Sequence, residues 1–394
     1  MSSIKRAITV GYWQDQSLGD LWTKEEIQEL APRYYRFTTR YTPQVSWIKE
    51  INPDSLVMYY RNFEGVYYGT ESGLTNPWNE FPHFVENDAV LKNVYGDYLI
   101  NRSFPIERLV DPANQWYRDY LRNLIRDTIE TYGYDAIFAD NVRPRYPDAS
   151  WHYGTPRAIN PRTGLEYTLD EYHADVMGLI NYVKGSYKIV FNGINQADSP
   201  WGYLANASRA ESLINATHGM MIEGPWGWSL SDFNSRSVET WKANVDLLAQ
   251  LMRVHPNKFQ DMTNPSAINN MIFAFCSFML AVSGDNWSVK YGGWRQLESE
   301  EWQTLTNYNY GKPLENYQIN GDVCSRKFEY AIIYVNPFTK QAGIEETEGP
   351  PPTPTPSVAL PVIMIGAGLT MNNPLIGIPI LLTGAGLYYL QRRG

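Results

Sequence analysis

Short apolar runs alternate with longer amphipathic stretches over the first three quarters of the chain. The short runs are rich in Val, Ile, Tyr and Phe, and this alternation is typical of strands covered by helices. We expect strands at residues 8–13, 34–39, 55–61, 134–141, 188–195, 219–225, 258–263 and 285–291. Because eight strand–helix units suggest a sheet that closes on itself, the pattern predicts an α/β protein with a (β/α)8 TIM barrel.

The stretches between these runs carry apolar residues at helical spacing. Thr23 and Glu26 form a capping box ahead of a helix at residues 24–30, and residues 114–132 place Tyr117, Leu121 and Ile125 on one stripe. Further helices are expected at residues 169–183, 238–254, 267–282 and 297–308. The segment 62–112 fits no single helix, so we expect an elaborated loop over the functional end of the barrel.

The pattern changes after the last strand–helix unit. Residues 323–335 predict a pair of strands joined at Glu329-Tyr330, which would form a small C-terminal β appendage that ends near Phe338. The sequence therefore divides into three expected parts. They are a barrel domain with its terminal β-hairpin at residues 1–340, a Pro/Thr-rich linker at 341–357, and a hydrophobic tail at 358–391.

The tail has no charged residue from Val358 to Leu390. It could form one transmembrane helix of roughly 17 residues from Pro374 onward, near the lower limit for spanning, or a membrane hairpin that turns at Asn372-Asn373. The small residues of 361–369 recur in 379–387 and permit close helix packing in lipid. We therefore expect the lipid bilayer as a partner, with the main domain at a cell or virion surface. The alternative is a tail that drives oligomerisation.

Composition excludes several classes of partner. A net charge of −9 lacks the basic footprint that nucleic-acid binding requires. Five His without an H-E-x-x-H array predict no metal site, and we expect no cofactor. Cys276 and Cys324 are expected to be packed thiols. The first expected strand follows Arg6 almost directly, so no secretory signal peptide is expected. Thirteen Trp and 29 Tyr could stack on sugars, although most such rings fill cores.

Two carboxylates close apolar runs, at the strand ends where barrels carry their active sites. Asp140 ends the fourth run and Glu223 the sixth. Burial of a carboxylate in that position is costly in free energy, which points to a functional role or to pairing with a cation. Such a pair suits glycoside hydrolysis, in which one group attacks or activates water and the other protonates the leaving oxygen. The alternative is that Asp140 caps the following loop and Glu223 pairs with Arg143 or Arg61.

Other polar and aromatic residues are expected at the same end of the barrel. They could hydrogen-bond to sugar hydroxyls or stack on sugar rings. These substrate-binding candidates are Tyr12, Arg61, Asn62, Asn141, Asn192, Asn195, Trp226 and Trp228. Asp135 precedes its strand and should be structural, whereas Asp261 and Asp285 are reserve candidates.

Three motifs carry a resemblance to a known family. They are Val110-Asp111-Pro112 followed by Trp116-Tyr117-Arg118-Asp119-Tyr120-Leu121, the run from Gly133 to Asn141, and the closing Arg326-Lys327-Phe328-Glu329-Tyr330 with Val335-Asn336-Pro337. With them the chain resembles the glycoside hydrolases of the fifteen-like type, TIM-barrel relatives of endo-α-galactosaminidases and α-galactosidases. The resemblance covers residues 8–337.

The resemblance implies roles for the two carboxylates. Asp140 would be the nucleophile and Glu223 the acid/base. The chain departs from the family at Ala136, where a glycine is usual, in lacking the usual N-terminal signal, and in its tail. The favoured hypothesis is a membrane-tethered glycoside hydrolase that acts on a polysaccharide or glycoconjugate. The rivals are a non-catalytic carbohydrate-binding surface or virion spike protein, and a scaffold assembled through the tail.

Overall fold

The computed structural model describes residues 7–11, 22–67, 80–101, 104–143, 158–194, 203–227, 230–264, 270–291 and 300–347. Eight strands form one sheet in which neighbouring strands are parallel. In spatial order they are β1 (Ala7–Gly11), β2 (Arg36–Thr39), β3 (Leu56–Asn62), β7 (Ala136–Asp140), β8 (Ile189–Ile194), β9 (Gly219–Glu223), β10 (Phe259–Asn264) and β11 (Trp287–Tyr291). The first and last strands also touch, so the sheet is nearly closed and fits a TIM barrel.

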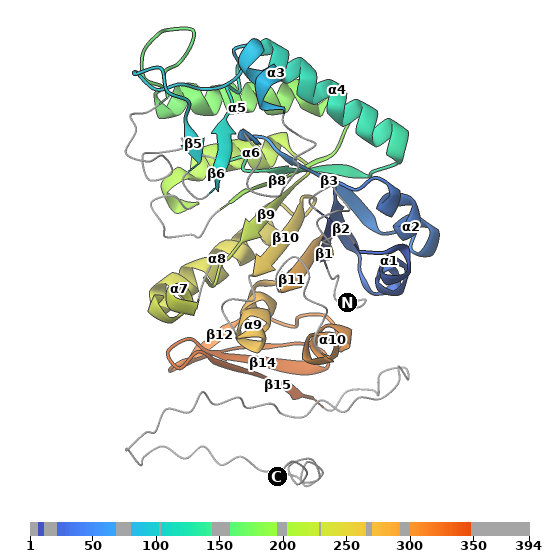
Figure 1. Ribbon diagram of the computed structural model, residues 1–394. Helices are drawn as coiled ribbons and strands as arrows, with labels where there is room; N and C mark the ends of the chain where they lie inside the picture. Colours follow the sequence, from blue (N-terminus) through green and yellow to red (C-terminus); the bar gives the residue numbers. More distant parts are fainter. Residues whose placement is uncertain are drawn as a thin grey trace, which may run out of the picture.

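Helices lie around the outside of the strands (Figure 1). They are α1 (Lys24–Leu30), α2 (Pro43–Ile51), α4 (Gln115–Tyr132), α5 (Leu169–Lys184), α6 (Ala207–Ala216), α7 (Leu230–Ser235), α8 (Val238–Val254), α9 (Met271–Ala281) and α10 (Glu300–Asn307). The predicted capping box at Thr23 and Glu26 is confirmed, and the structure adds two caps to α4. Thr23 and Glu26 form the capping box of α1, Asn114 caps α4, and Gly133 ends α4 in the left-handed conformation.

Two hydrophobic layers follow from the alternation of strand side chains. Inside the barrel, Met58, Tyr60, Phe138, Val190 and Met221 pack together. The intervening strand residues pack outward against the helices in a larger core. Both cysteines are free and buried, as expected. Asp135 accepts a hydrogen bond from the Val57 backbone N–H at 2.7 Å and pairs with Lys49, which confirms its structural role.

The segment 62–112 after β3, called the excursion below, contains secondary structure of its own. It contains α3 (Phe81–Glu86) and a small antiparallel sheet of β4 (Gly65–Tyr67), β6 (Phe104–Leu109) and β5 (Ile100–Asn101). This agrees with the predicted elaboration of the third unit. It also brings Glu107 of β6 against Gly65 of β4, since a Cβ on Gly65 would lie 2.2 Å from the Glu107 Oε1 atom.

The C-terminal appendage is larger than the predicted strand pair. Its four antiparallel strands are β12 (Gln318–Asn320), β13 (Val323–Lys327), β14 (Ala331–Asn336) and β15 (Gln341–Glu346). The predicted end near Phe338 is therefore wrong, and residues 341–346 belong to the sheet rather than to a linker. The polar and partly exposed β15 has no apolar alternation, but it completes the ladder of β14. Figure 1 shows this sheet below α9 and α10.

Among the described residues, no helix is both long and apolar enough to cross a membrane. The tail predicted at 358–391 lies outside the described residues, as does the rest of the predicted linker from residue 348.

Candidate active site

Asp140 and Glu223 lie at the carboxyl ends of β7 and β9, with β8 between them. The amide of Asn192 on β8 joins them. Its Nδ2 donates to Asp140 Oδ1 at 2.9 Å and to Glu223 Oε2 at 2.8 Å. These two oxygens can be no more than about 5.7 Å apart, and are about 5 Å apart if the two N–H bonds diverge by their usual angle. The sequence-predicted pair therefore meets at one place.

Asp140 is surrounded by hydrogen-bond donors. The Tyr60 hydroxyl donates to Oδ2 at 2.6 Å, and the Asn141 backbone N–H donates to Oδ1 at 2.9 Å, in addition to Asn192. A carboxylic acid would itself have to donate a proton, so this set of donors suits the anion. The contact with the Asn141 N–H also means that Asp140 does help to shape the loop that follows it.

Glu223 has a different environment. Its burial and the negative charge of Asp140 raise its pKa to about 7, against smaller opposing effects of Asn192, Lys290 and Arg143. Neither arginine that could have neutralised it does so by a salt bridge. Arg61 pairs with Glu80 and Arg143 pairs with Glu64. A carboxylate beside a carboxyl group that holds its proton near neutral pH is the arrangement needed for acid–base chemistry.

Arg61 and Asn62, predicted to contact sugar, instead bind other groups of the protein. Arg61 is 4% exposed and binds Glu80 through two hydrogen bonds of 3.1 and 2.8 Å. Adjacent strand residues point to opposite faces, so Arg61 lies on the outer side near Tyr120 of α4, 5.7 Å from its ring. Asn62 Oδ1 accepts the backbone N–H groups of Glu64 and Gly65 and shapes the turn after β3.

Trp226 also departs from its predicted place. Its ring is 1% exposed and belongs to the outer core, so it presents no face to a sugar. Trp226 lies between Gly224 and Gly227, both of which have positive φ. Asn141 lies beside Asp140 and is half-buried, so its sugar contact stays a prediction. Tyr12, Asn195 and Trp228 lie outside the described residues.

The reserve candidates do not join the site. Asp261 is buried and binds Arg36 and the Ser288 hydroxyl within the barrel. Asp285 is exposed just before β11, at the opposite end of the strands from Glu223. Within the described residues, no group of three His, Cys, Asp or Glu side chains could hold a metal ion.

Sequence reasoning missed Tyr60, Glu64 and Glu107 at this end of the barrel and named Arg143 only as a possible partner of Glu223. Tyr60 could have been found, because it shares the inner face of β3 with Asn62 by strand periodicity. Glu64, Glu107 and Arg143 are all buried beneath the site. Burial and the charge of Glu64 raise the pKa of Glu107 to about 7, while Asn62 and Arg143 oppose that shift. No sequence signal marks them, since their burial depends on the excursion after β3.

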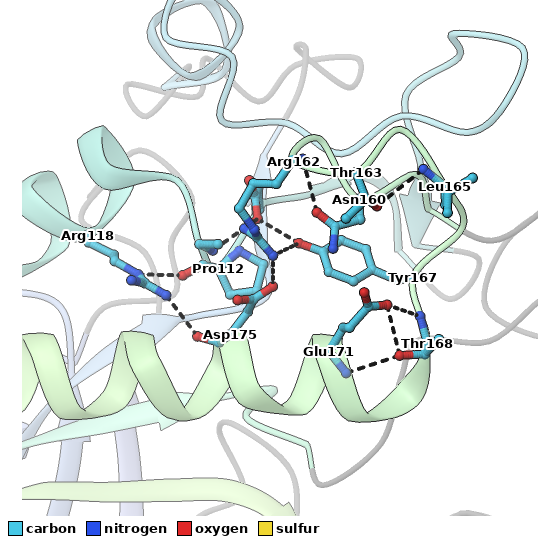
Figure 2. Close-up of polar contacts among 12 residues, drawn as sticks. Pro112, Arg118, Asn160, Arg162, Thr163, Leu165, Tyr167, Thr168, Glu171 and Asp175 are labelled. Atoms are coloured by element: carbon cyan, nitrogen blue, oxygen red, sulfur yellow. Dashed lines mark hydrogen bonds and ion pairs between the residues drawn. The ribbon is translucent and has the colours of Figure 1, made fainter.

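The motif at Asp111 anchors the connection that leads from β7 to α5 (Figure 2). Asp111 Oδ1 accepts a hydrogen bond from the Tyr167 hydroxyl at 3.1 Å, and Arg162 bonds to Tyr167 and Asp175. Arg118 donates to the Pro112 carbonyl at 2.8 Å and to the Asp175 carbonyl at 3.3 Å. These contacts fix the far end of the connection that begins at Asp140.

A family model described as "Hypothetical glycosyl hydrolase family 15" matches residues 49–332. The chain belongs to this family. The match confirms the resemblance inferred from the sequence motifs and identifies the protein as a glycoside hydrolase. None of the curated proteins compared with this glycoside hydrolase matches it.

Solved structures are similar to this glycoside hydrolase over much of its length. A maltogenic α-amylase, AmyB from Thermotoga neapolitana, is 10% identical, with 87% of this chain and 88% of that chain covered and a TM-score of 0.48. The α-N-acetylgalactosaminidase NagBb from Bifidobacterium bifidum is 9% identical, with 87% and 58% covered and a TM-score of 0.47. The glycoside hydrolase domain of PelA from Pseudomonas aeruginosa is 11% identical, with 74% and 94% covered and a TM-score of 0.44. Likenesses this distant carry no conclusion about substrate.

Proposed function

We propose that this glycoside hydrolase cleaves O-glycosidic bonds of a polysaccharide or glycoconjugate with retention of configuration. Asp140 is the nucleophile and Glu223 the acid/base. The observation that carries the proposal is the Asn192 amide, which hydrogen-bonds to both carboxyl groups. Retaining glycosidases hold their carboxyl groups about 5–5.5 Å apart, whereas inverting enzymes separate them by about 6.5–9.5 Å to admit water. The spacing set by Asn192 favours the retaining arrangement.

The first step uses the different protonation of the two groups. Glu223 gives its proton to the glycosidic oxygen, and the leaving group departs as an alcohol. An Asp140 oxygen forms a bond to the anomeric carbon as the glycosidic bond breaks, which gives a covalent glycosyl ester. In the second step the Glu223 carboxylate takes a proton from water, and the resulting hydroxide displaces Asp140. The sugar leaves with its original configuration and Glu223 regains its proton.

Two substitutions test these assignments through the leaving group. Asp140→Asn should lower hydrolysis by orders of magnitude on every glycoside, because it removes the nucleophile while nearly conserving shape. Glu223→Gln should have a low kcat/KM on alkyl glycosides that recovers on dinitrophenyl glycosides, because kcat/KM reports the first step and that leaving group needs no proton. The initial product should keep the anomeric configuration of the substrate by NMR.

The outcomes of this test separate the proposal from its rivals. Inverted product would overturn the retaining mechanism, and unchanged turnover in both variants would overturn the two residue assignments. A wild-type protein that binds glycans but cleaves none would favour the non-catalytic carbohydrate-binding surface or virion spike protein instead.

We further propose that the glycoside hydrolase is tethered to a lipid bilayer by residues 358–391, with its barrel at a cell or virion surface. The support is the uncharged run from Val358 to Leu390, which follows a Pro/Thr-rich spacer. The alternative use of this segment is oligomerisation through the tail.

A further inference from the structure

Arg143 lies three residues after Asp140, at the start of the connection between β7 and α5. The backbone here runs against β8, since the Val142 N–H donates to the Asn192 carbonyl at 2.9 Å. Gly193 permits this close approach, because a Cβ there would lie 1.8 Å from the Val142 carbonyl oxygen. The segment that carries Arg143 is therefore held against the same strand that supplies the Asn192 bridge.

The Arg143 guanidinium is buried between two partners. Its side chain is 9% exposed and its Nη2 lies 3.6 Å from Glu64 Oε2. The same nitrogen donates to the Asn141 side-chain oxygen at 2.5 Å. A buried cation is costly unless it is paired and hydrogen-bonded, so Glu64 and Asn141 together hold Arg143 in place.

Asn141 links Arg143 to the nucleophile. Its φ of 60° lies in the left-handed region, which asparagine adopts more readily than other non-glycine residues and which its side-chain contacts help to hold. Its backbone N–H donates to Asp140 Oδ1 at 2.9 Å, and its Nδ2 lies 3.5 Å from Asp140 Oδ2. Because guanidinium has donors and no acceptor, Arg143 fixes the Asn141 oxygen on its own side and leaves the amide nitrogen facing Asp140.

We propose that Arg143 is a positioning residue for the hydrolysis, acting through Asn141 to orient the Asp140 carboxylate, and that Glu64 in turn positions Arg143. The inference rests on the proposed function, in which Asp140 attacks the anomeric carbon. Without Arg143, the Asn141 amide is free to turn its oxygen toward Asp140 and repel it, and the left-handed backbone loses a contact that favours it.

The residues around Glu64 support this role. Asn62 Oδ1 accepts the Glu64 backbone N–H at 2.9 Å, which places Glu64 at the turn after β3. Glu107 lies close enough for its pKa to be raised to about 7 by burial and by the charge of Glu64. Glu64 in turn lies 3.6 Å from the Arg143 guanidinium, so the ion pair that holds Arg143 is built into the turn after β3.

The test compares Arg143→Met and Arg143→Lys with the wild type. We expect Arg143→Met to lower kcat by about 10- to 100-fold, the usual effect of losing a hydrogen-bond network at a charged group, with KM nearly unchanged. The accompanying loss in kcat/KM should persist on dinitrophenyl glycosides, as for Asp140→Asn and unlike Glu223→Gln. Added guanidinium ion should restore part of the rate. Arg143→Lys should stay slow, because a point charge does not reproduce the planar fork.

A matched control is Arg326→Met, which removes another buried arginine from the appendage. It should leave kcat of the folded enzyme unchanged. If Arg143→Met does not fold, Glu64→Gln tests the same chain of contacts and should lower kcat in the same leaving-group-independent way.

Structural and kinetic outcomes distinguish failure of this inference from failure of the proposed function. A crystal structure of Arg143→Met in which Asn141 keeps its left-handed backbone and its amide contact with Asp140 would overturn the inference. So would a folded variant with wild-type kcat. A wild-type enzyme that hydrolyses no glycoside would instead overturn the proposed function, and the Asn141 conformation in the variant would still decide the positioning role.

Discussion

Replacement of Asn192 by Leu should move the pH dependence of the glycoside hydrolase in a defined direction. The substitution keeps the size of the side chain and removes the hydrogen bonds to Asp140 and Glu223. The Asn192 hydrogen bond opposes the rise in the Glu223 pKa to about 7. Its loss should therefore raise that pKa further, while an apolar side chain keeps water from replacing the amide.

The size of the shift follows from the contact that is lost. A hydrogen bond to a charged group contributes about 1.5–3 kcal/mol, and one pKa unit corresponds to about 1.4 kcal/mol, so the expected shift is about 1 to 2 units. Glu223 must be protonated to act as the acid. The alkaline limb of the kcat/KM profile, which reports the free enzyme, should consequently move from near pH 7 toward about pH 8 to 9.

The assay is kcat/KM on an alkyl glycoside across the pH range, for the wild type and Asn192→Leu. Asn52→Leu is the matched control. Its amide also donates to two acceptors, the carbonyls of Ala31 and Tyr34, but it lies at the opposite end of the strands. Its profile should stay in place. A folded Asn192→Leu variant whose alkaline limb coincides with that of the wild type would refute the coupling between this amide and the acid.

Three further predictions concern stability and the tail. Burial raises the Glu107 pKa from 4.5 to about 7, so the folded state loses stability as pH rises between those values. Glu107→Gln should therefore raise the free energy of unfolding by up to about 3 kcal/mol near pH 8 and by little near pH 4, as measured by denaturant titration. Arg326→Met should lower the free energy of unfolding by about 2–4 kcal/mol, because Arg326 donates to the carbonyls of Met279, Leu280 and Val282. Substitution of the exposed neighbour, Lys327→Met, is the control, and an equal Tm for both variants would contradict the stabilising role of Arg326. A chain ending at Gly349 should stay folded and soluble, whereas the full chain should need detergent; full-length protein that is monomeric in plain buffer would disprove the membrane tether.

The strands of the barrel could be predicted because each is a short apolar run between polar stretches. The same logic located Asp140 and Glu223, since strand ends in a nearly closed parallel sheet meet at one edge. It could not locate Glu64 or Glu107, and it named Arg143 only as a possible partner of Glu223. Their burial depends on β4 and β6 packing over the end of β3, and such contacts between distant short strands leave little trace in local periodicity.

The structure differs from the predicted sugar contacts of Arg61 and Trp226 because those predictions considered neither strand direction nor burial. Arg61 and Asn62 are adjacent, so a strand that directs Asn62 to the inner face must direct Arg61 outward. Trp226 was assigned by residue type, although most large aromatic side chains fill cores. In both cases strand direction or burial, rather than chemical suitability, decided which side chain reaches the site.

Helix α9 has a consequence for how this enzyme can be divided. Every residue from Met271 to Ala281 is buried except the half-buried Ile272, because α8 covers one side and the strands β13, β14 and β15 cover another. A helix that is apolar on all sides is stable only when its neighbours cover every side. Removal of the appendage would expose this helix and leave the carbonyls at its end without Arg326. The barrel and its appendage should therefore unfold in one cooperative transition, and no cut between residues 308 and 347 should release an autonomous catalytic fragment.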